Sequence, residues 1–418
     1  MDDKKLYWLW LQGALGPGAR TDEITAVFPS PGEMYSSGEI EWKLSGVLTN
    51  KQIEKLSAYS PEKAQGIVEI CNNNGWEIIT PDDREYPSNL RSMRNFPLAL
   101  YVRGDLSKVT QRVCVAVVGT RSASFQGSYL AHRYAAALSY AGFCVVSGAA
   151  LGIDSAAHNG SLSAGGPTAA VLGCGFGVDY LMENRHLRDD IAQSGALITE
   201  FPPGTPASAR TFPIRNRIIS GLSEATVVIE AGIKSGSLIT AHCAMEQGRE
   251  VFAPPGDVFN SSYAGANSLI KDGARPLFSV FDLIEEYAIR FPDRIRETDV
   301  EKALEFLSGK RELSAEEMDR PAKTVLRPHP SQRGEPADKP TGQTDKPTPF
   351  EVRKLISLPA NLSEKAKTVY NNFGEEPLFA DEISKNTGLA PWEVISALTE
   401  LELSDLVCLC AGKRYKKI

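Results

Sequence analysis

Metal-binding motifs are what this 418-residue sequence most clearly lacks. Its seven cysteines form no C-x-x-C pair, and it has only five histidines. Structural zinc sites use closely spaced cysteine and histidine ligands, so we expect no metal site. Most of the cysteines lie within apolar runs, where a buried, reduced thiol is the simplest interpretation.

An excess of positive charge is missing as well. The sequence has 45 Lys and Arg against 52 Asp and Glu, a net charge of −7, so bulk charge gives no sign of nucleic-acid binding and local charge must be examined. The first ten residues, MDDKKLYWLW, lack the pattern of a signal peptide. The uncharged stretch 134–153 is interrupted by Gly142, Ser147 and Gly148, and it fits a helix end followed by a buried strand better than a membrane span. We therefore expect a cytoplasmic protein without membrane contact.

Cofactor fingerprints are absent too. The apolar run that ends at Val118 is followed by GTRSAS, without the later glycines of a dinucleotide loop, and Ser147 stands where such a site needs an acidic residue. No Walker lysine motif occurs. These absences predict that the protein binds neither NAD nor ATP, and we expect no cofactor.

A strand–helix alternation dominates the middle of the chain. The predicted strands are short and apolar on both faces: 113–118, 143–147, 168–173, 196–200, 225–230 and 250–254. Helical stretches such as 126–141, 154–163 and 237–247 lie between most of them. This alternation predicts a doubly wound, mostly parallel, Rossmann-like α/β sheet covered by helices on both faces.

The flanking regions differ in composition. We expect a small helical domain over 1–80, in which LQGALGPGARTDEI indicates two helices around a glycine turn, either a plain helical turn or a helix-hairpin-helix that contacts DNA. The Rossmann-like domain, 81–295, includes a lead-in of short strands and proline turns over 76–106. Seven prolines and no aromatic residue over 308–349 predict a flexible linker. Three helices and a terminal hairpin over 355–418 predict a winged-helix domain.

Small residues follow nearly every predicted strand of the middle region. Because the carboxyl ends of parallel strands share one edge, these loops form a rim of free backbone N–H groups and helix N-termini, which favours an anion. The loop from Phe201 to Ser223 contains no Asp or Glu but carries Arg210, Arg215 and Arg217, and Arg121 opens onto the same rim. With Phe212 beside the arginines, the pattern is typical of single-stranded nucleic-acid binding. Alternatively, Phe212 is a core residue and the arginines are solvated or ion-paired.

Catalytic candidates are few. Asp154, with His158 one turn later, stands at a helix start, where a capping role is common. Glu200 and Glu230 end predicted strands, and either carboxylate would suit a nucleotide-hydrolysing, glycosidase-like enzyme that uses the same phosphate-binding rim. A third interpretation is a sensor, in which the rim binds a small ligand and the winged domain reports it.

Ordered motifs give a specific resemblance. VVGTRSAS, SGAALGIDSAAH, TEFPPGTP, FPIRNRIISGLS and EAGIKSGSLITA, with the lead-in YPSNLRSMRNFPLALYVRGDL, resemble the DNA-processing protein A (DprA, also called Smf) family. The resemblance implies a binding protein, without a known catalytic reaction, that protects incoming single-stranded DNA and helps load the RecA recombinase during natural transformation. It also implies a homodimer formed through the α/β domain.

The resemblance also implies site residues. Arg121 would bind phosphate, Phe212 would stack a base, and the DNA pocket would be lined by Arg215, Asn216 and Arg217. Ser122, Gly148, Ser235, Gly236 and Ser237 would shape its rim. This sequence departs from the family at two positions. The family often has an arginine where SGAALGID has Leu151, so one positive group of the rim is missing here. The family also commonly has a proline after the tyrosine of GVDYLMENRHL, where this sequence has leucine.

The winged-helix segment is ambiguous. Residues 361–418 carry seven Lys and Arg against nine Asp and Glu, although GKRYKKI places four basic groups at the wing. Contact with duplex DNA, a protein partner and a purely structural role remain open, in that order of preference.

Overall fold

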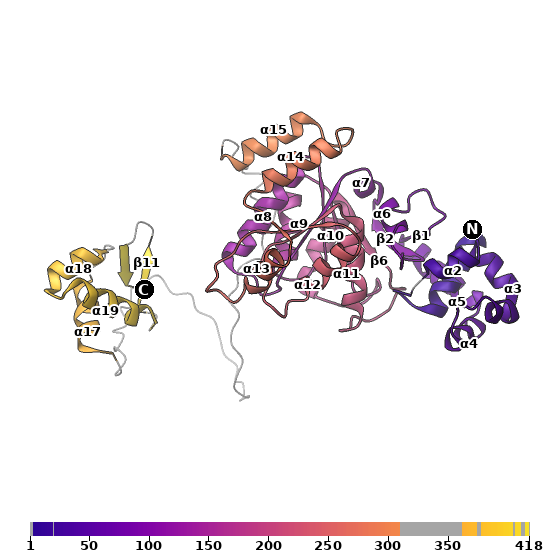
Figure 1. Cartoon of the computed structure of the whole chain (residues 1–418), viewed down its shortest axis with the longest axis horizontal. Helices are drawn as coiled ribbons and strands as arrows, with labels where there is room; N and C mark the ends of the chain where they lie inside the picture. The colour runs from indigo at the N-terminus through magenta and orange to yellow at the C-terminus, as the bar shows by residue number, and fades with distance from the viewer. Residues whose placement is uncertain are drawn as a thin grey trace, which may run out of the picture. The chain divides into compact units, whose positions relative to one another are not determined.

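The computed structural model describes residues 3–19, 21–309, 362–373, 378–403, 406–410 and 414–417 (Figure 1). The chain divides into two compact units, within residues 1–330 and 331–418. All but the first two residues of the predicted linker, 308–349, lie outside the described residues. Among the residues that are described, no helix is both long enough and apolar enough to cross a membrane.

A nine-stranded sheet of order β1-β2-β6-β5-β4-β3-β7-β8-β9 organises the first unit. Its strands are β1 (Glu77–Ile79), β2 (Leu100–Gly104), β3 (Cys114–Val118), β4 (Cys144–Ser147), β5 (Thr168–Val171), β6 (Ala196–Thr199), β7 (Ala225–Val228), β8 (Glu250–Ala253) and β9 (Arg275–Pro276). The strands from β6 to β9 run parallel, so the predicted doubly wound, mostly parallel sheet is confirmed.

The predicted lead-in, residues 76–106, forms part of the sheet itself. Its strands β1 and β2 extend the sheet, with β2 antiparallel to β6 and β1 antiparallel to β2. The sheet therefore begins at Glu77, a few residues before the predicted start of the Rossmann-like domain.

Helices cover both faces of the sheet because its central strands are apolar on both sides. In β3, Cys114, Ala116 and Val118 face one layer and Val115 and Val117 face the other. The first layer contains α6 (Ser88–Arg91), α7 (Ser107–Thr110), α11 (Thr211–Leu222), α12 (Ser237–Glu246) and α13 (Ala264–Lys271). The second contains α8 (Phe125–Tyr140), α9 (Ile153–Ser163), α10 (Arg185–Ser194), α14 (Val280–Arg290) and α15 (Glu297–Leu307), and a short 3-10 helix, η1 (Met182–Asn184), precedes α10.

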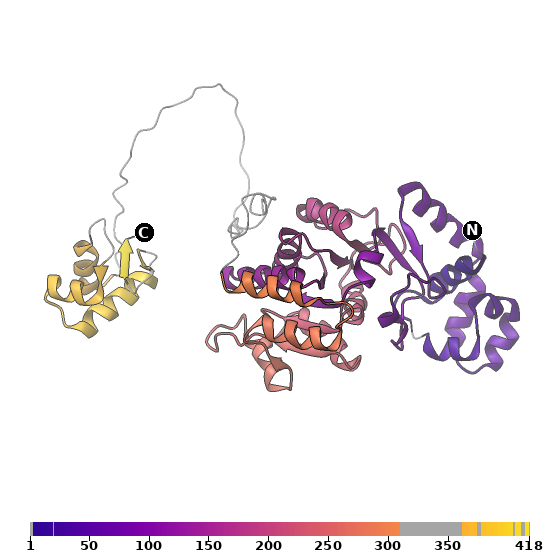
Figure 2. The same cartoon turned by 90° about the horizontal axis from the view of Figure 1, so that it is seen from above.

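The N-terminal helices form a bundle beside the β1 edge of the sheet, as Figures 1 and 2 show. They are α1 (Asp3–Leu15), α2 (Asp22–Val27), α3 (Pro31–Leu44), α4 (Asn50–Ala58) and α5 (Pro61–Asn74). Trp8, Trp10 and Trp42 lie in its buried core. The amide of Gln12 donates to the carbonyls of Ala99 and Glu200, which joins the bundle to the sheet.

The second unit has the predicted winged-helix form. Its helices are α17 (Glu364–Asn372), α18 (Ala380–Thr387) and α19 (Pro391–Leu403). Its strands β10 (Leu378–Phe379), β11 (Val407–Cys410) and β12 (Arg414–Lys417) form an antiparallel sheet of order β10-β12-β11. The helices enclose a small apolar core that includes Val369, Ile383 and Leu398.

Candidate nucleic-acid interface

The strand order of the sheet reverses between β3 and β7. From β3 the chain adds β4, β5 and β6 on one side, and it then returns to place β7 on the other. In open α/β sheets, ligands bind beyond the carboxyl ends of the strands at this kind of switch point. A pocket of about 430 Å³ lies here, which we call the rim pocket; it is lined by residues from 118–121, 209–219 and 235–240, with Ala150 and Asp154.

Arg121, in the loop after β3, and Phe212, in the first turn of α11, meet at this pocket although they are far apart in the sequence. The Arg121 guanidinium carbon lies 4.8 Å from the centroid of the Phe212 ring. Arg121 is exposed, and it forms no ion pair within the part of the chain that the structure describes. A charged, planar guanidinium stacked on an aromatic ring therefore faces solvent, an arrangement suited to a phosphate and an adjacent base.

The Phe212 ring is held in place from several sides. A Cβ atom at Gly173 would approach its Cδ1 to 2.7 Å, so the glycine allows the ring to pack directly on the backbone after β5. The rings of Tyr180 and Phe212 lie 5.7 Å apart at 44°, and the Arg215 guanidinium lies 5.8 Å from the Phe212 centroid. Phe212 is partly exposed, and it is therefore a supported platform rather than a core residue.

Arg215 lines the rim pocket, but its guanidinium donates hydrogen bonds to other groups of the protein. Its Nη1 donates to the carbonyls of Gly148 and Val171, and its Nε donates to Oδ1 of Asn216. Burial lowers the pKa of Arg215, and the Asp154 carboxylate opposes that shift. Arg215 thus ties the loop after β4 to β5 and α11, and it contributes rigidity more than free charge.

Gly148 permits this arrangement. A Cβ atom there would lie 2.3 Å from Nη1 of Arg215 and 2.7 Å from Oδ2 of Asp154. That carboxylate oxygen accepts hydrogen bonds from the N–H groups of Gly148 and Ala150. Burial raises the pKa of Asp154, and Arg215 opposes the shift. Asp154 at the start of α9 therefore orders the preceding loop.

The start of α12 closes the other side of the rim pocket. The hydroxyls of Ser235 and Ser237 lie 2.8 Å apart, and Nδ2 of Asn216 donates to the Gly236 carbonyl at 3.2 Å. The positive end of this ten-residue helix faces the pocket, which favours an anionic group.

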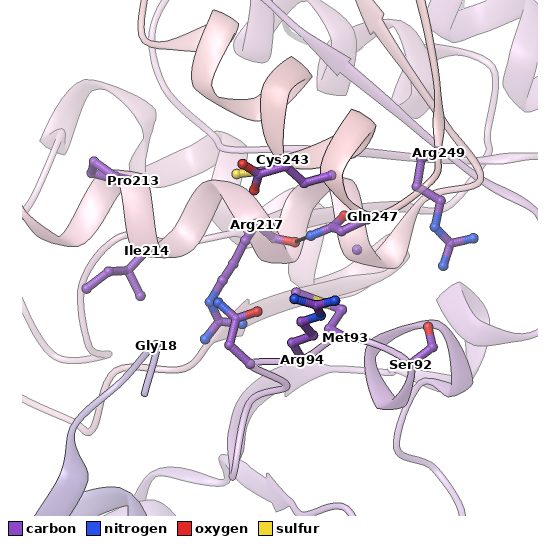
Figure 3. A pocket seen from close by; sticks show the side chains of 13 residues that line it. Gly18, Ser92, Met93, Arg94, Pro213, Ile214, Arg217, Cys243, Gln247 and Arg249 are labelled. Atoms are coloured by element: carbon purple, nitrogen blue, oxygen red, sulfur yellow. Dashed lines mark hydrogen bonds between the residues drawn. The ribbon is translucent and has the colours of Figure 1, made fainter. Parts of the chain in front are cut away.

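Three predicted residues, Ser122, Gly148 and Arg217, do not line the rim pocket. Gly148 lies behind the pocket, where its carbonyl accepts a hydrogen bond from Arg215. Ser122 is exposed on the outside of the loop. Arg217 is two residues from Arg215 on α11, a rotation of about 200°, and it therefore points to the other side of the helix. Figure 3 shows it reaching from α11 toward Gly18 and Arg94.

Arg217 lines a second pocket of about 810 Å³, which we call the junction pocket. This pocket lies where the N-terminal bundle meets the sheet domain; it is lined by Gly18, residues 92–95, one side of α11 and residues from 243–249.

Neither carboxylate of the hydrolase alternative lines the rim pocket. Glu200 is buried, and it accepts hydrogen bonds from the Gly18 N–H and from Nη2 of Arg217. Burial raises the pKa of Glu200, and Arg217 opposes the shift. Glu230 is fully buried, and its Oε2 accepts hydrogen bonds from the N–H and hydroxyl of Ser124 at the start of α8. Both carboxylates are engaged in internal contacts, which speaks against nucleotide hydrolysis at this rim.

His158 is a structural residue too. It is fully buried, with its Nδ1 2.7 Å from the Thr168 hydroxyl, while its Nε2 accepts a hydrogen bond from the Ala149 N–H. Burial and the nearby Arg215 lower the pKa of His158 to about 3. The ring is therefore neutral and supports the loop after β4.

The sequence analysis assigned no role to Tyr180, which packs against Phe212. The signal was present, because Tyr180 lies in the motif GVDYLMENRHL. Leu151, which replaces the family arginine, is 40% exposed and follows Ala150 at the pocket. Over the described ranges, no group of three or more His, Cys, Asp or Glu side chains is placed to hold a metal ion.

Comparison with known proteins agrees with this architecture. The family model described as DNA recombination-mediator protein A matches residues 77–288. The model of the DprA winged helix domain matches residues 357–413. The X-ray structure of DNA processing protein A from Streptococcus pneumoniae is 32% identical, with a TM-score of 0.58, covering 66% of this chain and 95% of that one.

Curated relatives extend the similarity. DNA processing protein DprA of Bacillus subtilis is 38% identical over 224 residues, which are 54% of this chain and 75% of that protein. Protein Smf of Synechocystis is 34% identical over 346 residues, which are 82% of this chain and 80% of that protein. The chain therefore belongs to the DNA recombination-mediator protein A family.

Proposed function

We propose that this protein is a recombination mediator that binds single-stranded DNA at the rim pocket. The observation that carries the proposal is the exposed Arg121 guanidinium stacked on Phe212 at the switch point of the sheet. Asp154 is the acidic residue that lines the pocket, and it interacts electrostatically with Arg215, so the charge of Arg121 is left for a ligand. No site residue is assigned a catalytic step.

A single strand fits this arrangement better than a duplex does. Guanidinium and aromatic planes bind a base by stacking, which requires a base that is free of its partner strand. A duplex offers only its phosphates to such a pocket, and it would lose the stacking contribution. We therefore assign a phosphate to Arg121 and the start of α12, and an adjacent base to Phe212.

We further propose that the protein protects incoming DNA and helps load RecA during natural transformation. Membership in the family supports this role. We propose that it acts as a homodimer through the Rossmann-like domain, because large apolar side chains are exposed there. Ile233 is 63% exposed, Val258 80% and Phe259 95%, and exposed apolar patches commonly mark association surfaces. A Val258→Ser, Phe259→Ser variant is expected to sediment as a monomer where the parent sediments as a dimer.

For the winged-helix domain we propose contact with duplex DNA. Its wing presents Arg414 and Lys416 to solvent, and Arg414 stacks on the Phe379 ring at 4.7 Å. Removing residues 320–418 should then weaken duplex binding and leave oligo(dT) binding unchanged.

The decisive experiment is a salt titration of binding to oligo(dT) and to a duplex of equal length. Arg121→Ala should weaken oligo(dT) binding by about tenfold and lower the salt slope by about 0.7, because one phosphate contact is lost. Arg84→Ala removes an exposed arginine far from the pocket in sequence and serves as the matched control. Equal affinity of the two variants would place the DNA elsewhere.

A further inference from the structure

The junction pocket is large, and the DNA-binding site that we propose at the rim does not include it. Its volume of about 810 Å³ is within the range of small-ligand sites, roughly 300–1,000 Å³. It lies on the opposite side of α11 from the rim pocket. Figure 3 shows Arg94, Arg217 and Arg249 around it, with Cys243 and Gln247 contributed by α12 and the residue that follows it.

Several buried polar atoms at this pocket have no hydrogen-bond partner among the described residues. Arg217 is only 5% exposed, and its Nη2 donates to Glu200, but its Nε and Nη1 are unpaired. Nε of Arg249 and Oε1 of Gln247 are unpaired as well. Buried unpaired groups are rare in folded proteins and often mark the place of a bound species. These atoms are three donor nitrogens and one acceptor oxygen, and this excess of donors favours a ligand rich in acceptor oxygens.

The charges around the pocket add a second constraint. Arg217 pairs with Glu200, and Arg249 pairs with Glu224 at 3.0 Å. Arg94 is exposed and forms no ion pair within the described part of the chain. Glu246 is exposed and also lines the pocket, so the carboxylates balance the arginines overall. Attraction for an anion must therefore come from directed N–H groups and from the Arg94 side of the pocket.

We propose that the junction pocket binds a phosphate group through Arg94, Arg217 and Arg249. Guanidinium groups bind phosphate oxygens through several directed N–H donors, which matches the unpaired nitrogens here. The phosphate belongs either to a free phosphate or nucleotide or to a DNA strand. The proposal does not rest on DNA binding at the rim pocket.

Cys243 provides a direct readout, because it lines the pocket and is half-buried. Burial and then Glu246 raise the pKa of its thiol, and Arg217 opposes them, so alkylation with iodoacetamide is run at alkaline pH. Peptide mass spectrometry separates Cys243 from the other cysteines. The experiment uses full-length protein carrying Arg121→Ala and Phe212→Ala, which lacks both side chains proposed to contact DNA at the rim, so a DNA probe reports on the junction pocket.

Sodium phosphate, dAMP and oligo(dT) are the probes, with sodium chloride at matched ionic strength as the control. A bound phosphate is expected to slow alkylation of Cys243 by about threefold when the probe is at twice its dissociation constant. Protection by sodium phosphate and dAMP assigns the site to a free phosphate. Protection by oligo(dT) alone assigns it to a DNA strand.

Substitutions at two exposed residues are expected to change the protection of Cys243 in opposite directions. Arg94→Ala should weaken protection, and Glu246→Gln should strengthen it, because a repelling carboxylate is removed; neither side chain is buried, so the fold is retained. Absence of protection by every probe, equal protection by chloride, or protection unchanged in both variants overturns the proposal. Loss of rim-pocket DNA binding alone leaves it standing, so the two proposals fail separately.

Discussion

The rim pocket and the junction pocket lie on opposite sides of α11, and arginine lines both. At the rim, Arg121 is exposed and stacks on Phe212 at 4.8 Å, without an ion pair among the described residues. At the junction, Arg217 is 5% exposed and paired with Glu200. The comparison teaches that burial and pairing, rather than residue type, decide whether an arginine is available to a polymer in solution.

The glycine turn of the N-terminal bundle sharpens the same contrast. The N–H of Gly18 donates to Oε1 of Glu200 at 3.1 Å. The turn therefore directs this group to a buried carboxylate and not outward to a DNA phosphate. One acidic residue, Glu200, thereby holds both the turn and Arg217 at the junction.

The largest difference between the pockets should be in stability. Arg217→Ala leaves the Glu200 carboxylate buried and without its partner, and it is expected to lower the free energy of unfolding by about 3–5 kcal/mol. Arg121→Ala removes an exposed side chain and should change it by less than about 0.5 kcal/mol. Urea denaturation measures both. Adding Glu200→Gln to Arg217→Ala should restore part of the loss, and similar stabilities for the two single variants would break the comparison.

The next effect should be in binding at the rim. Phe212→Ala removes the stacking platform and is expected to weaken oligo(dT) binding by about 1–3 kcal/mol. Fluorescence anisotropy at fixed salt measures the change. Phe278→Ala removes a phenylalanine that is 77% exposed and lies outside both pockets, so it serves as the control. An unchanged affinity in Phe212→Ala would show that the ring neither stacks a base nor positions Arg121 for DNA.

The pH dependence of the free energy of unfolding tests whether His158, which supports the loop after β4, is held neutral in the folded protein. The pKa of His158 is lowered to about 3 in the folded protein, so the unfolded chain binds a proton that the folded chain does not. The His158 contribution to stability is therefore present above pH ~6.5 and is lost at up to about 1.4 kcal/mol per pH unit as the pH falls toward 3.

His158→Asn should lack this slope, and the difference between the two proteins isolates the histidine. The raised pKa values of Asp154 and Glu200 act in the opposite direction, because their contribution is lost as the pH rises, and they act in both proteins. Chemical denaturation between pH 7 and 5 measures the stability of the parent and of His158→Asn. Parallel curves for the two proteins would show that His158 titrates as a solvated side chain.

The smallest effect should be a gain. Leu151→Arg restores the arginine that the family often has beside the rim pocket. We expect oligo(dT) to bind severalfold more tightly, with a salt slope steeper by about 0.7, because one more phosphate is contacted. Leu151→Gln adds length without charge and should leave both quantities unchanged. An arginine without effect would indicate that the strand does not pass over the loop after β4.

Much of the fold was predictable from local pattern. Apolar runs that alternate with helical stretches placed β3 to β8 within two residues of the observed ends. The strands β1 and β2 were expected only as short strands of a lead-in, because proline turns, and not the long helical stretches of the alternating pattern, surround them. The antiparallel pairing of β2 with β6 depends on contacts across about 100 residues of chain, and β1 then pairs with β2.

The site was predictable in part. Glycine-rich strand ends and the acid-free stretch around TFPIRNR pointed to one rim, and the structure brings Arg121, Phe212, Arg215, Asn216 and Ser235–Ser237 together there. The separation of Arg217 from Arg215 follows from helical geometry once the segment is known to be helical. The partner of Arg217 does not follow from any pattern, because Glu200 lies in a different element, in the loop directly after β6.

By itself, the sequence determined the class of fold, the edge of the sheet at which we propose that DNA binds, and the residue types available there. Those features depend on local composition and on periodicity, which any segment carries with it. Only the tertiary structure decided which arginine faces solvent and which is neutralised. That choice depends on packing. A guanidinium that lies on an aromatic ring at the surface is available to a ligand, whereas one that packs against a carboxylate from a distant segment forms a buried ion pair.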